Sequence, residues 1–426
     1  MQKTSFKKRF YALFLPMFCA LSTGVTVPRS YAQTLDIAPP YGDCSIAYWS
    51  SNRNLDDRSA TASALCFANW RIALGQTTRL SFNARANYSD QRLQGRVREA
   101  YLDQDLGAMS LRMGRQIIAW GRADRINPSD VLSPRDFRLL SSEDDDQRNG
   151  INAIRLRYAL TPAISAIVVA AKFEAHQTPQ GSLPANIAKA FDLHRTQWAA
   201  KLDHVGSGLD WSVFLFDGFD RFARYRLALT EAGAPILKGD YERVKVIGGD
   251  IASASASWTW RGEFSHTRSS LACDLCPPIK RVVNRFVAGV DRDLFGSLNM
   301  NLQFYGVKRR SHLPVTIEAI PFAIPFAIPF VITDGLNRLN SEYAASESGV
   351  SLRLSDRLLN DKLKWELSVA RDFKRHSTFW RPRISYALSD QFKVSAGADQ
   401  FIGKQQSYFG SLKKNSLQYV ALSFVF

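Results

Sequence analysis

Hydrophobic and polar residues alternate along most of this chain, in segments of roughly ten residues separated by turn-forming residues. Residues 298–304 read Leu-Asn-Met-Asn-Leu-Gln-Phe, and residues 363–369 read Leu-Lys-Trp-Glu-Leu-Ser-Val. A period of two is that of a β-strand with one apolar and one polar face, because successive side chains point to opposite sides. The pattern therefore predicts an all-β protein.

Short and long connections alternate between the expected strands. We expect short turns at 75–77, 103–107, 160–162, 204–208, 253–255, 293–296, 355–361 and 388–391, and long polar stretches at 119–150, 175–192, 218–242, 269–279, 309–346 and 403–414. Transmembrane barrels have short periplasmic turns and long external loops, an asymmetry that a soluble β-sandwich or β-helix does not require. We expect a single transmembrane antiparallel β-barrel of about 18 strands, within a range of roughly 16–18.

The last strand carries the most specific signal. Val420, Leu422, Phe424 and Phe426 share one face of the segment 418–426, and the chain ends on Phe426. A final strand of this kind resembles the signal that the outer-membrane assembly machinery reads, so we expect that machinery as a partner. This resemblance implies the outer membrane of a Gram-negative bacterium as the location.

The first 32 residues have the three parts of a secretory signal peptide. Basic residues (Lys3, Lys7, Lys8 and Arg9) precede the apolar stretch 11–21, and Ser30-Tyr31-Ala32 supplies small residues for cleavage. A membrane anchor is the alternative, but the apolar stretch is short and is broken by Pro16. We expect a signal peptide over residues 1–32, cleaved near Ala32, and a barrel over residues 33–426. After the signal we find no run long enough for a transmembrane helix, so strands must make any membrane span.

The chain is basic, with a formal net charge of +16. Loss of the signal removes five basic residues and no acidic ones, which leaves +11. Because an exported chain seldom meets nucleic acid, we expect anionic solutes and the phosphates of lipopolysaccharide as partners instead.

Four cysteines remain once Cys19 leaves with the signal, and an even number in an oxidising compartment suggests two disulfides. Cys44 and Cys66 are equally far from Leu55, so a hairpin centred there would bring them opposite each other. Cys273 and Cys276 would close a small loop. A zinc site is the alternative, but it needs two further ligands at motif spacing, and only His266 is close. We expect no metal and no cofactor.

The polar faces of the expected strands carry more basic than acidic residues, and they predict a basic lumen wall. The candidate selectivity residues are Arg79, Arg85, Arg112, Arg155, Arg157, Arg261, Arg353 and Lys364. Acidic residues such as Asp203, Glu263, Glu366 and Asp399 are fewer on these faces. A basic wall concentrates anions and repels cations. The alternative is a network of ion pairs that braces the barrel.

The stretch 111–137 begins as a strand and then stops alternating. Strict alternation would place Arg115 on the lipid side, so we expect either a bulge at Gly114 or a position for Arg115 near the outer rim. Two turn clusters follow, at 127–130 and 133–136. The candidate residues of this loop are Arg115, Trp120, Arg122, Asp124, Arg125, Asp130, Arg135 and Asp136. We expect an ordered loop that either folds into the mouth as a constriction or caps the rim.

The same stretch contains Gly114-Arg115-Gln116, Trp120-Gly121, Asn127-Pro128 with Asp130, and Pro134-Arg135-Asp136. These residues resemble a motif of poorly characterised families of proteobacterial outer-membrane barrels, and more distantly the alginate-export type of barrel. The resemblance implies a porin-like or export role and assigns no ligand residues.

Two further features leave alternatives open. Residues 319–330 repeat Ala-Ile-Pro-Phe three times; proline at every fourth position favours an extended conformation, and the segment is either a contact surface or a functionless repeat. The six histidines (His176, His194, His204, His266, His312 and His376) match no barrel-enzyme motif, so we expect no catalytic residues.

We expect a passive channel for a small anionic solute or polymer, with no nucleic acid bound and an undetermined oligomeric state. The alternatives are a non-conducting surface barrel of an envelope system and, less favoured, an enzyme that acts on lipid or polysaccharide.

Overall fold

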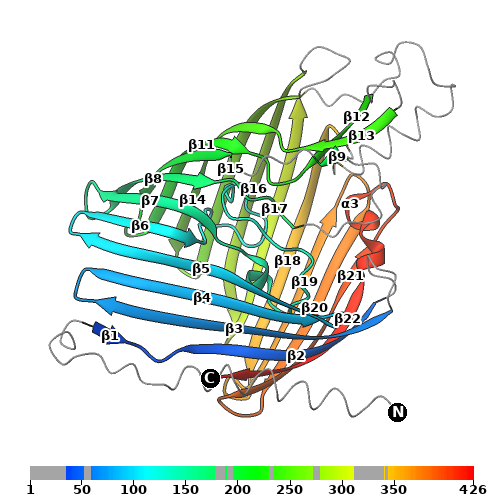
Figure 1. Cartoon of the computed structure of the whole chain (residues 1–426). Helices are drawn as coiled ribbons and strands as arrows, with labels where there is room; N and C mark the ends of the chain where they lie inside the picture. The colour runs from blue at the N-terminus through cyan, green and yellow to red at the C-terminus, as the bar shows by residue number, and fades with distance from the viewer. Residues whose placement is uncertain are drawn as a thin grey trace.

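The computed structural model describes residues 35–51, 59–177, 188–189, 195–229, 235–271, 279–310, 340 and 344–426. Over these residues the chain forms one closed antiparallel barrel of 18 strands, each paired with its neighbours in chain order (Figure 1). The first ten barrel strands are β2 (Tyr41–Ser51), β3 (Ala60–Leu74), β4 (Thr78–Ser89), β5 (Arg92–Leu106), β6 (Met109–Gln116), β7 (Ile151–Ala159), β8 (Ile164–Lys172), β10 (Thr196–His204), β11 (Leu209–Phe219) and β14 (Arg243–Ser255). The other eight are β15 (Trp258–Leu271), β16 (Ile279–Phe295), β17 (Leu298–Arg310), β18 (Ser346–Leu358), β19 (Leu363–Asp372), β20 (Ser377–Ala387), β21 (Phe392–Ile402) and β22 (Leu417–Val425).

The last strand closes the barrel against the first. β22 pairs with β21 on one side and with β2 on the other, where Ile46 faces Leu422. On β22, Val420 and Leu422 are exposed on the outer surface, whereas Tyr419 and Ala421 are buried inside. The predicted all-β barrel with an alternating terminal strand is therefore confirmed.

The remaining elements are small. β1 (Leu35–Ile37) pairs with the end of β3, in line with β2. β9 (Ala188–Lys189), β12 (Arg224–Leu229) and β13 (Pro235–Asp240) form a separate three-stranded sheet. The described residues also contain three short helical turns, η1 (Asp144–Gln147), α3 (Tyr408–Ser411) and η3 (Lys413–Asn415). No helix among the described residues is long and apolar enough to cross a membrane.

Each of the eight predicted short turns joins a pair of adjacent barrel strands, although some turns lie a few residues later than expected. The turn between β14 and β15, for example, is at 256–257, and that between β18 and β19 is at 359–362. The long connections lie at the other end of the barrel. Because short turns are periplasmic in such barrels, this end faces the exterior.

The barrel wall has an apolar outer face and a polar inner face. On β17, Leu302 and Phe304 are exposed, whereas Asn301 and Gln303 between them are buried. An exposed apolar belt is unfavourable in water and favourable in lipid. The barrel wall is therefore suited to a lipid bilayer.

A disulfide joins Cys44 of β2 to Cys66 of β3, at directly paired positions with a Cα–Cα distance of 4.0 Å. The predicted hairpin geometry is confirmed for this pair. Cys273 and Cys276, the repeat 319–330 and the proposed signal 1–32 lie outside the described residues.

Candidate functional site

The segment 117–150, between β6 and β7, folds into the barrel, and we call it the lumen loop. Its first part is apolar and packs on the inner wall: Ile118, Trp120 and Leu132 join a cluster with Phe214 and Val246 of the wall. Trp120 lies 5.5 Å from Phe214, centroid to centroid. This side of the lumen is dry, since Leu132 is 1 % and Phe214 2 % exposed.

A single carboxylate of the wall fixes the next turn of the lumen loop. Glu263, near the middle of β15, accepts hydrogen bonds from the backbone N–H groups of Arg122 and Ala123 at 2.6 Å and of Ser129 at 3.2 Å. Gly121 has a φ of +105°, and a Cβ at this position would lie 2.5 Å from Glu263 Oε1. Only glycine therefore allows the loop to approach this carboxylate so closely.

Ion pairs with two neighbouring strands support the same turn. Arg122 pairs with Asp203 of β10, 3.1 Å away, and with the buried Asp250 of β14. Lys201 pairs with Asp203 at 3.0 Å, and Ser212 donates a hydrogen bond to Asp250. These buried charges are paired, as low-dielectric surroundings require.

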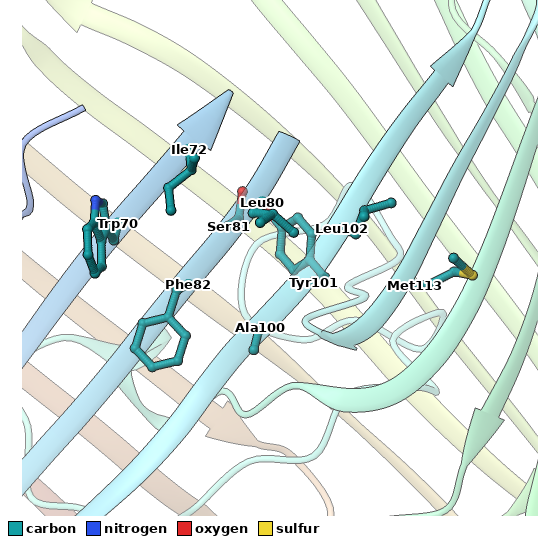
Figure 2. Close-up of a pocket in the computed structure, with 9 residues that line it drawn as sticks. All are labelled: Trp70, Ile72, Leu80, Ser81, Phe82, Ala100, Tyr101, Leu102 and Met113. Carbon is teal, nitrogen blue, oxygen red and sulfur yellow. The ribbon is translucent and has the colours of Figure 1, made fainter. Parts of the chain in front are cut away.

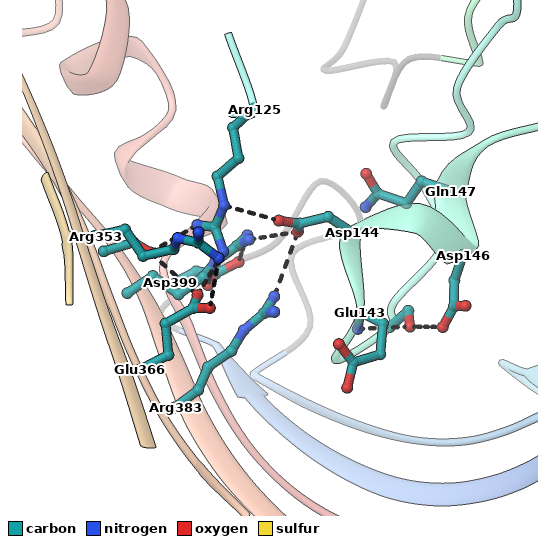
Figure 3. Close-up of polar contacts among 12 residues, drawn as sticks. Arg125, Glu143, Asp144, Asp146, Gln147, Arg353, Glu366, Arg383 and Asp399 are labelled. Carbon is teal, nitrogen blue, oxygen red and sulfur yellow. Dashed lines mark hydrogen bonds and ion pairs between the residues drawn. The ribbon is translucent and has the colours of Figure 1, made fainter. Parts of the chain in front are cut away.

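The tip of the lumen loop enters a charged network on the wall formed by β18–β21 (Figure 3). Arg125 pairs with Glu366 of β19 and, at 3.5 Å, with Asp144 in the second half of the loop. Asp124 pairs with Arg353 of β18 at 2.9 Å.

Asp144 extends this network of ion pairs to the neighbouring strand β20. Its carboxylate pairs with Arg381 and, at 3.4 Å, with Arg383. Arg381 also pairs with Asp399 of β21. Burial alone raises the pKa of Asp144, but the charges of Arg381, Arg383 and Arg125 outweigh this effect and lower it to about 2.

Water reaches this network. Arg125 is 29 % exposed and Glu366 22 % exposed. The face of the lumen loop that packs on β7–β14 is thus buried, whereas the face towards β17–β20 is exposed to solvent. The loop contacts β15 and β18 near the middle of these strands.

The second half of the lumen loop is fixed by buried polar contacts. Asp136 pairs with Arg85 of β4 at 3.3 Å, and Asp130 pairs with Arg148 at 2.6 Å. Arg221, from the connection after β11, donates hydrogen bonds to the backbone carbonyls of Ser133 and Asp130. The loop is therefore held from two sides at positions that carry its turn clusters.

His176, in the connection after β8, belongs to the same assembly. Its Nδ1 accepts a hydrogen bond from the backbone N–H of Arg135 at 2.8 Å, and its ring packs on Phe137 and Phe222. Burial and the nearby charge of Arg221 lower the pKa of His176 to about 2. The imidazole is therefore neutral at physiological pH, as an acceptor requires.

The predicted selectivity residues separate into paired and unpaired groups. Four of them form ion pairs: Arg85 with Asp136, Arg112 with Asp103, Arg261 with Asp291, and Arg353 with Asp124. Among the described residues, no acidic partner lies within ion-pair distance of Arg79, Arg155, Arg157 or Lys364. Arg155 lies directly opposite Arg112, and Arg79 lies opposite Asp103, so three of the four unpaired residues gather on β4–β7.

Arg115 lies at the extracellular end of β6 and not at a register shift. The pairing of β5 with β6 continues without a shift through Gly114, and Arg115 is one residue from the end of β6. Its guanidinium pairs with Glu174 and donates a hydrogen bond to the carbonyl of Val97 at 3.0 Å. These partners lower the cost of a charge at a lipid-side position.

Several residues that hold the lumen loop were not predicted from the sequence. Asp144, Asp250, Arg381, Arg221 and His176 were not among the predicted loop or selectivity residues. The run of four acidic residues at 143–146 is a signal that could have located Asp144, because such a run inside a basic barrel needs cationic partners.

A shallow depression of about 470 Å³ lies on the wall formed by β3–β6 (Figure 2). Its lining is apolar, and Leu80, Phe82 and Met113 are exposed on the lipid-facing side. The depression faces the bilayer and is no part of the lumen. Among the described residues, no cluster of His, Cys, Asp or Glu is suited to hold a metal ion.

No protein-family profile matches the chain, and no curated protein matches it in sequence. Solved structures do match it in fold. OccAB1 of Acinetobacter baumannii has a TM-score of 0.56 at 8% identity, with 91% of this chain and 95% of that chain covered.

Two structures from Pseudomonas aeruginosa are similar to a slightly lesser extent. OccK2 (OpdF) in complex with glucuronate has a TM-score of 0.53, and OpdK with vanillate has 0.51; each is 9% identical and covers 91% of this chain and 98% of its own. At this identity the likeness shows the fold, which is that of the Occ-type outer-membrane porins with a closed 18-strand barrel.

Proposed function

We propose that this protein is a passive channel in the outer membrane of a Gram-negative bacterium and conducts small anionic solutes. The observation that carries the proposal is the position of the lumen loop. It contacts Glu263, Arg353 and Glu366 near mid-depth on the β15–β19 part of the wall and reaches Arg85 of β4 across the barrel, and one flank of it is wet. A loop that narrows a water-filled barrel in this way acts as its constriction.

The unpaired arginines support a preference for anions. The charges around the loop tip are interleaved and paired, so they add little net field. Arg79, Arg155 and Arg157, in contrast, share the inner face of β4–β7 and lie towards the periplasmic ends of these strands. Asp103, which pairs with Arg112, and Asp105 share this face, so the group has a net positive charge. Net positive charge in a confined space raises the local concentration of anions.

The names of the similar structures are consistent with this solute class. OccK2 was solved with glucuronate and OpdK with vanillate, and both ligands are organic anions. We extend that class to this chain because of its own unpaired arginines.

Several other expectations form part of the same proposal. The chain starts with a signal peptide over residues 1–32 that is cleaved near Ala32, the strand ending at Phe426 is read by the assembly machinery, and no reaction is catalysed. The motif at 114–136 relates the chain to the uncharacterised proteobacterial barrels and, more distantly, to the alginate-export type.

The test is the ion selectivity of the refolded mature protein in a planar bilayer. We expect a reversal potential that indicates anion preference, and a shift towards cations in the variant Arg79→Ser/Arg155→Ser/Arg157→Ser. The matched control is Lys308→Ser/Arg310→Ser/Arg371→Ser, which removes the same charge from the outer wall and is expected to leave selectivity unchanged. An equal shift in both variants would contradict the assignment.

The extensive contacts of the lumen loop favour one alternative, a barrel that is closed at rest. Shortening the loop by removal of residues 122–137 distinguishes the two cases. If the unaltered protein conducts and the shortened one conducts more, the loop is a constriction. If only the shortened protein conducts, the loop is a plug and the barrel serves another role until it opens.

A further inference from the structure

Basic residues gather on the outer wall at the extracellular ends of neighbouring strands. They are Arg268 of β15, Lys308 and Arg310 of β17, Arg371 of β19, and Lys374 in the turn between β19 and β20, and we call them the outer basic patch. All five side chains are exposed. Lys308 and Arg310 continue the face of β17 on which Leu302 and Phe304 are exposed, so they point away from the lumen.

The strand register makes these residues contiguous. Arg268 lies opposite Val282, and Val282 lies opposite Arg310 on the next strand. Lys308 lies opposite Ser346, whose hydroxyl accepts a hydrogen bond from Lys374 Nζ at 3.2 Å.

Arg371 joins the patch on the other side of this turn. It lies opposite Thr378, and its guanidinium donates a hydrogen bond to the hydroxyl of Thr378 at 3.3 Å. Arg268 Nε likewise donates a hydrogen bond to His266 Nε2, at 3.0 Å. These contacts orient the side chains without neutralising their charge.

No acidic side chain balances this patch within the described chain. On the outward faces of β15–β21 the one acidic residue is Asp356, at the periplasmic end of β18. A contrasting case lies on β14, where the outward Arg243 and Lys245 both pair with Asp217. The charge of the outer basic patch therefore has no acidic partner among the described residues, whereas the charge of Arg243 and Lys245 is compensated by Asp217.

Aromatic side chains lie beside the patch on the same face. Phe304 and Phe373 are stacked with centroids 6.4 Å apart, and Phe286 and Trp380 are exposed beside them. Aromatic residues at this height are typical of the boundary between acyl chains and head groups. The basic residues consequently lie at the level of the head groups.

We propose that the outer basic patch binds the phosphate groups of a phosphorylated lipid in the outer leaflet, with its acyl chains against Phe304, Phe373 and Trp380. Multiple guanidinium and ammonium groups are suited to phosphate oxygens, and each cation near such a surface strengthens binding. A solute on its way to the lumen is a poor match for this position, because the patch faces away from the pore. The inference is independent of the transported solute.

Native mass spectrometry of the refolded protein with diphosphoryl lipid A as probe tests the assignment. We expect roughly tenfold or greater loss of affinity in the variant Lys308→Ser/Arg310→Ser/Arg371→Ser/Lys374→Ser. The matched control, Arg243→Ser/Lys245→Ser, removes outward charge that is already compensated and should retain the affinity. Equal binding by the patch variant and the unaltered protein would overturn the proposal, as would equal losses in both variants.

Further probes identify the source of the phosphate. Lipid A stripped of its phosphates should bind as weakly as the patch variant binds the intact lipid, and inorganic phosphate in millimolar excess should not displace bound lipid. Full displacement by inorganic phosphate would overturn a lipid site in favour of a free anion. Heat-modifiable electrophoretic mobility confirms that the variants are folded; if the fourfold variant does not fold, Lys308→Gln/Lys374→Gln replaces it, with the same outcomes.

Discussion

Glu263 holds the lumen loop by its backbone and leaves the loop's own charged side chains available for other partners. Its carboxylate accepts three N–H groups within eight residues of chain, while Arg122 turns to Asp203 and Asp250, and Arg125 to Glu366. A charged acceptor forms stronger hydrogen bonds than a neutral one in such surroundings. Glu263 therefore fixes the turn at 122–129, and the ion pairs with other strands hold the rest of the lumen loop.

Glu263→Gln should loosen the lumen loop. The amide keeps one acceptor oxygen but places a donor where the second oxygen was, which leaves an N–H group unsatisfied at a local cost of about 1–3 kcal/mol. We expect larger and noisier open-channel currents in a planar bilayer. Gly121→Ala should act in the same direction because its Cβ would press on the same carboxylate. Thr259→Ser, on the same face of β15, is the control, and unaltered current noise in Glu263→Gln would contradict this role.

Asp146 makes the lumen loop sensitive to pH. Burial raises the pKa of Asp146 to about 6, against a hydrogen bond from Ser141 that lowers it, and the other charges that face it are Asp43, Arg98 and Glu143. A carboxyl group with a raised pKa contributes stability below its unfolded value of 3.8, and this contribution is lost as the pH rises through 6. Asp144 does not titrate in this window because its pKa is about 2.

The loop around η1 should accordingly open less often at pH 5 than at pH 7.5. We expect slower amide hydrogen exchange over residues 139–148 at the lower pH, after correction for the intrinsic rate, by on the order of 1–2 kcal/mol in opening free energy. In Asp146→Asn the neutral side chain is present at both pH values, so the difference should disappear. Persistence of the full difference in this variant would assign it to another group.

At the scale of single elements, the hairpin of β2 and β3 is tied by the disulfide between Cys44 and Cys66. The bond closes a chain segment with a sequence separation of 22 residues. In the chain-entropy description, a loop of this length stabilises the folded state by about 3 kcal/mol, because the unfolded chain loses freedom. The bond also lies next to the seam at which β2 meets β22.

The variant Cys44→Ser/Cys66→Ser should therefore unfold more readily. We expect a lower urea midpoint for the folded barrel in detergent, with the loss concentrated in the β22–β2–β3 region. Thiol labelling before and after reduction of the unaltered protein establishes that the bond is present. An unchanged midpoint would show that strand pairing alone fixes this hairpin.

The strands could be predicted from sequence because the bilayer imposes a strict rule on them. Each strand must be apolar outside and polar inside, so a period of two appears wherever a strand such as β17 or β19 crosses. Turn positions were less accurate. Strand pairing continues for a few residues beyond the membrane, as in β14, which ends at Ser255. In these residues the alternation of apolar and polar positions no longer distinguishes strand from turn.

The position of the lumen loop could not be predicted from the sequence, for a different reason. Its residues lack any period, and their partners lie far along the chain: Arg125 meets Glu366, and Asp144 meets Arg381. Such pairings follow from closure of the barrel and leave no local trace. The sequence therefore predicted an ordered charged loop, but it left open whether Trp120 and Arg122 enter the lumen or cap the rim.

At the scale of the whole molecule, the excess positive charge occupies separate surfaces. One part lies on the inner face of β4–β7, where Arg79, Arg155 and Arg157 have no acidic partner among the described residues. Another lies on the outer wall at Lys308, Arg310 and Arg371. The net charge of +16 is thus not spread evenly over the chain. The inner surface acts on solutes and the outer one on lipid, and each can be altered without the other.

Salt should weaken the selectivity of the inner surface in a predictable way. The Debye length falls from about 10 Å at 0.1 M salt to about 3 Å at 1 M, so unpaired arginines act across a lumen at low salt and only on adjacent ions at high salt. We expect the ratio of chloride to potassium permeability, measured from reversal potentials under a fixed gradient, to fall towards one as the mean salt concentration rises. In Arg79→Ser/Arg155→Ser/Arg157→Ser the ratio should be lower at 0.1 M and should change less with salt. A ratio that stays constant over this range would show that selectivity arises from direct contact at the constriction, and the unpaired arginines would then lose their assigned role.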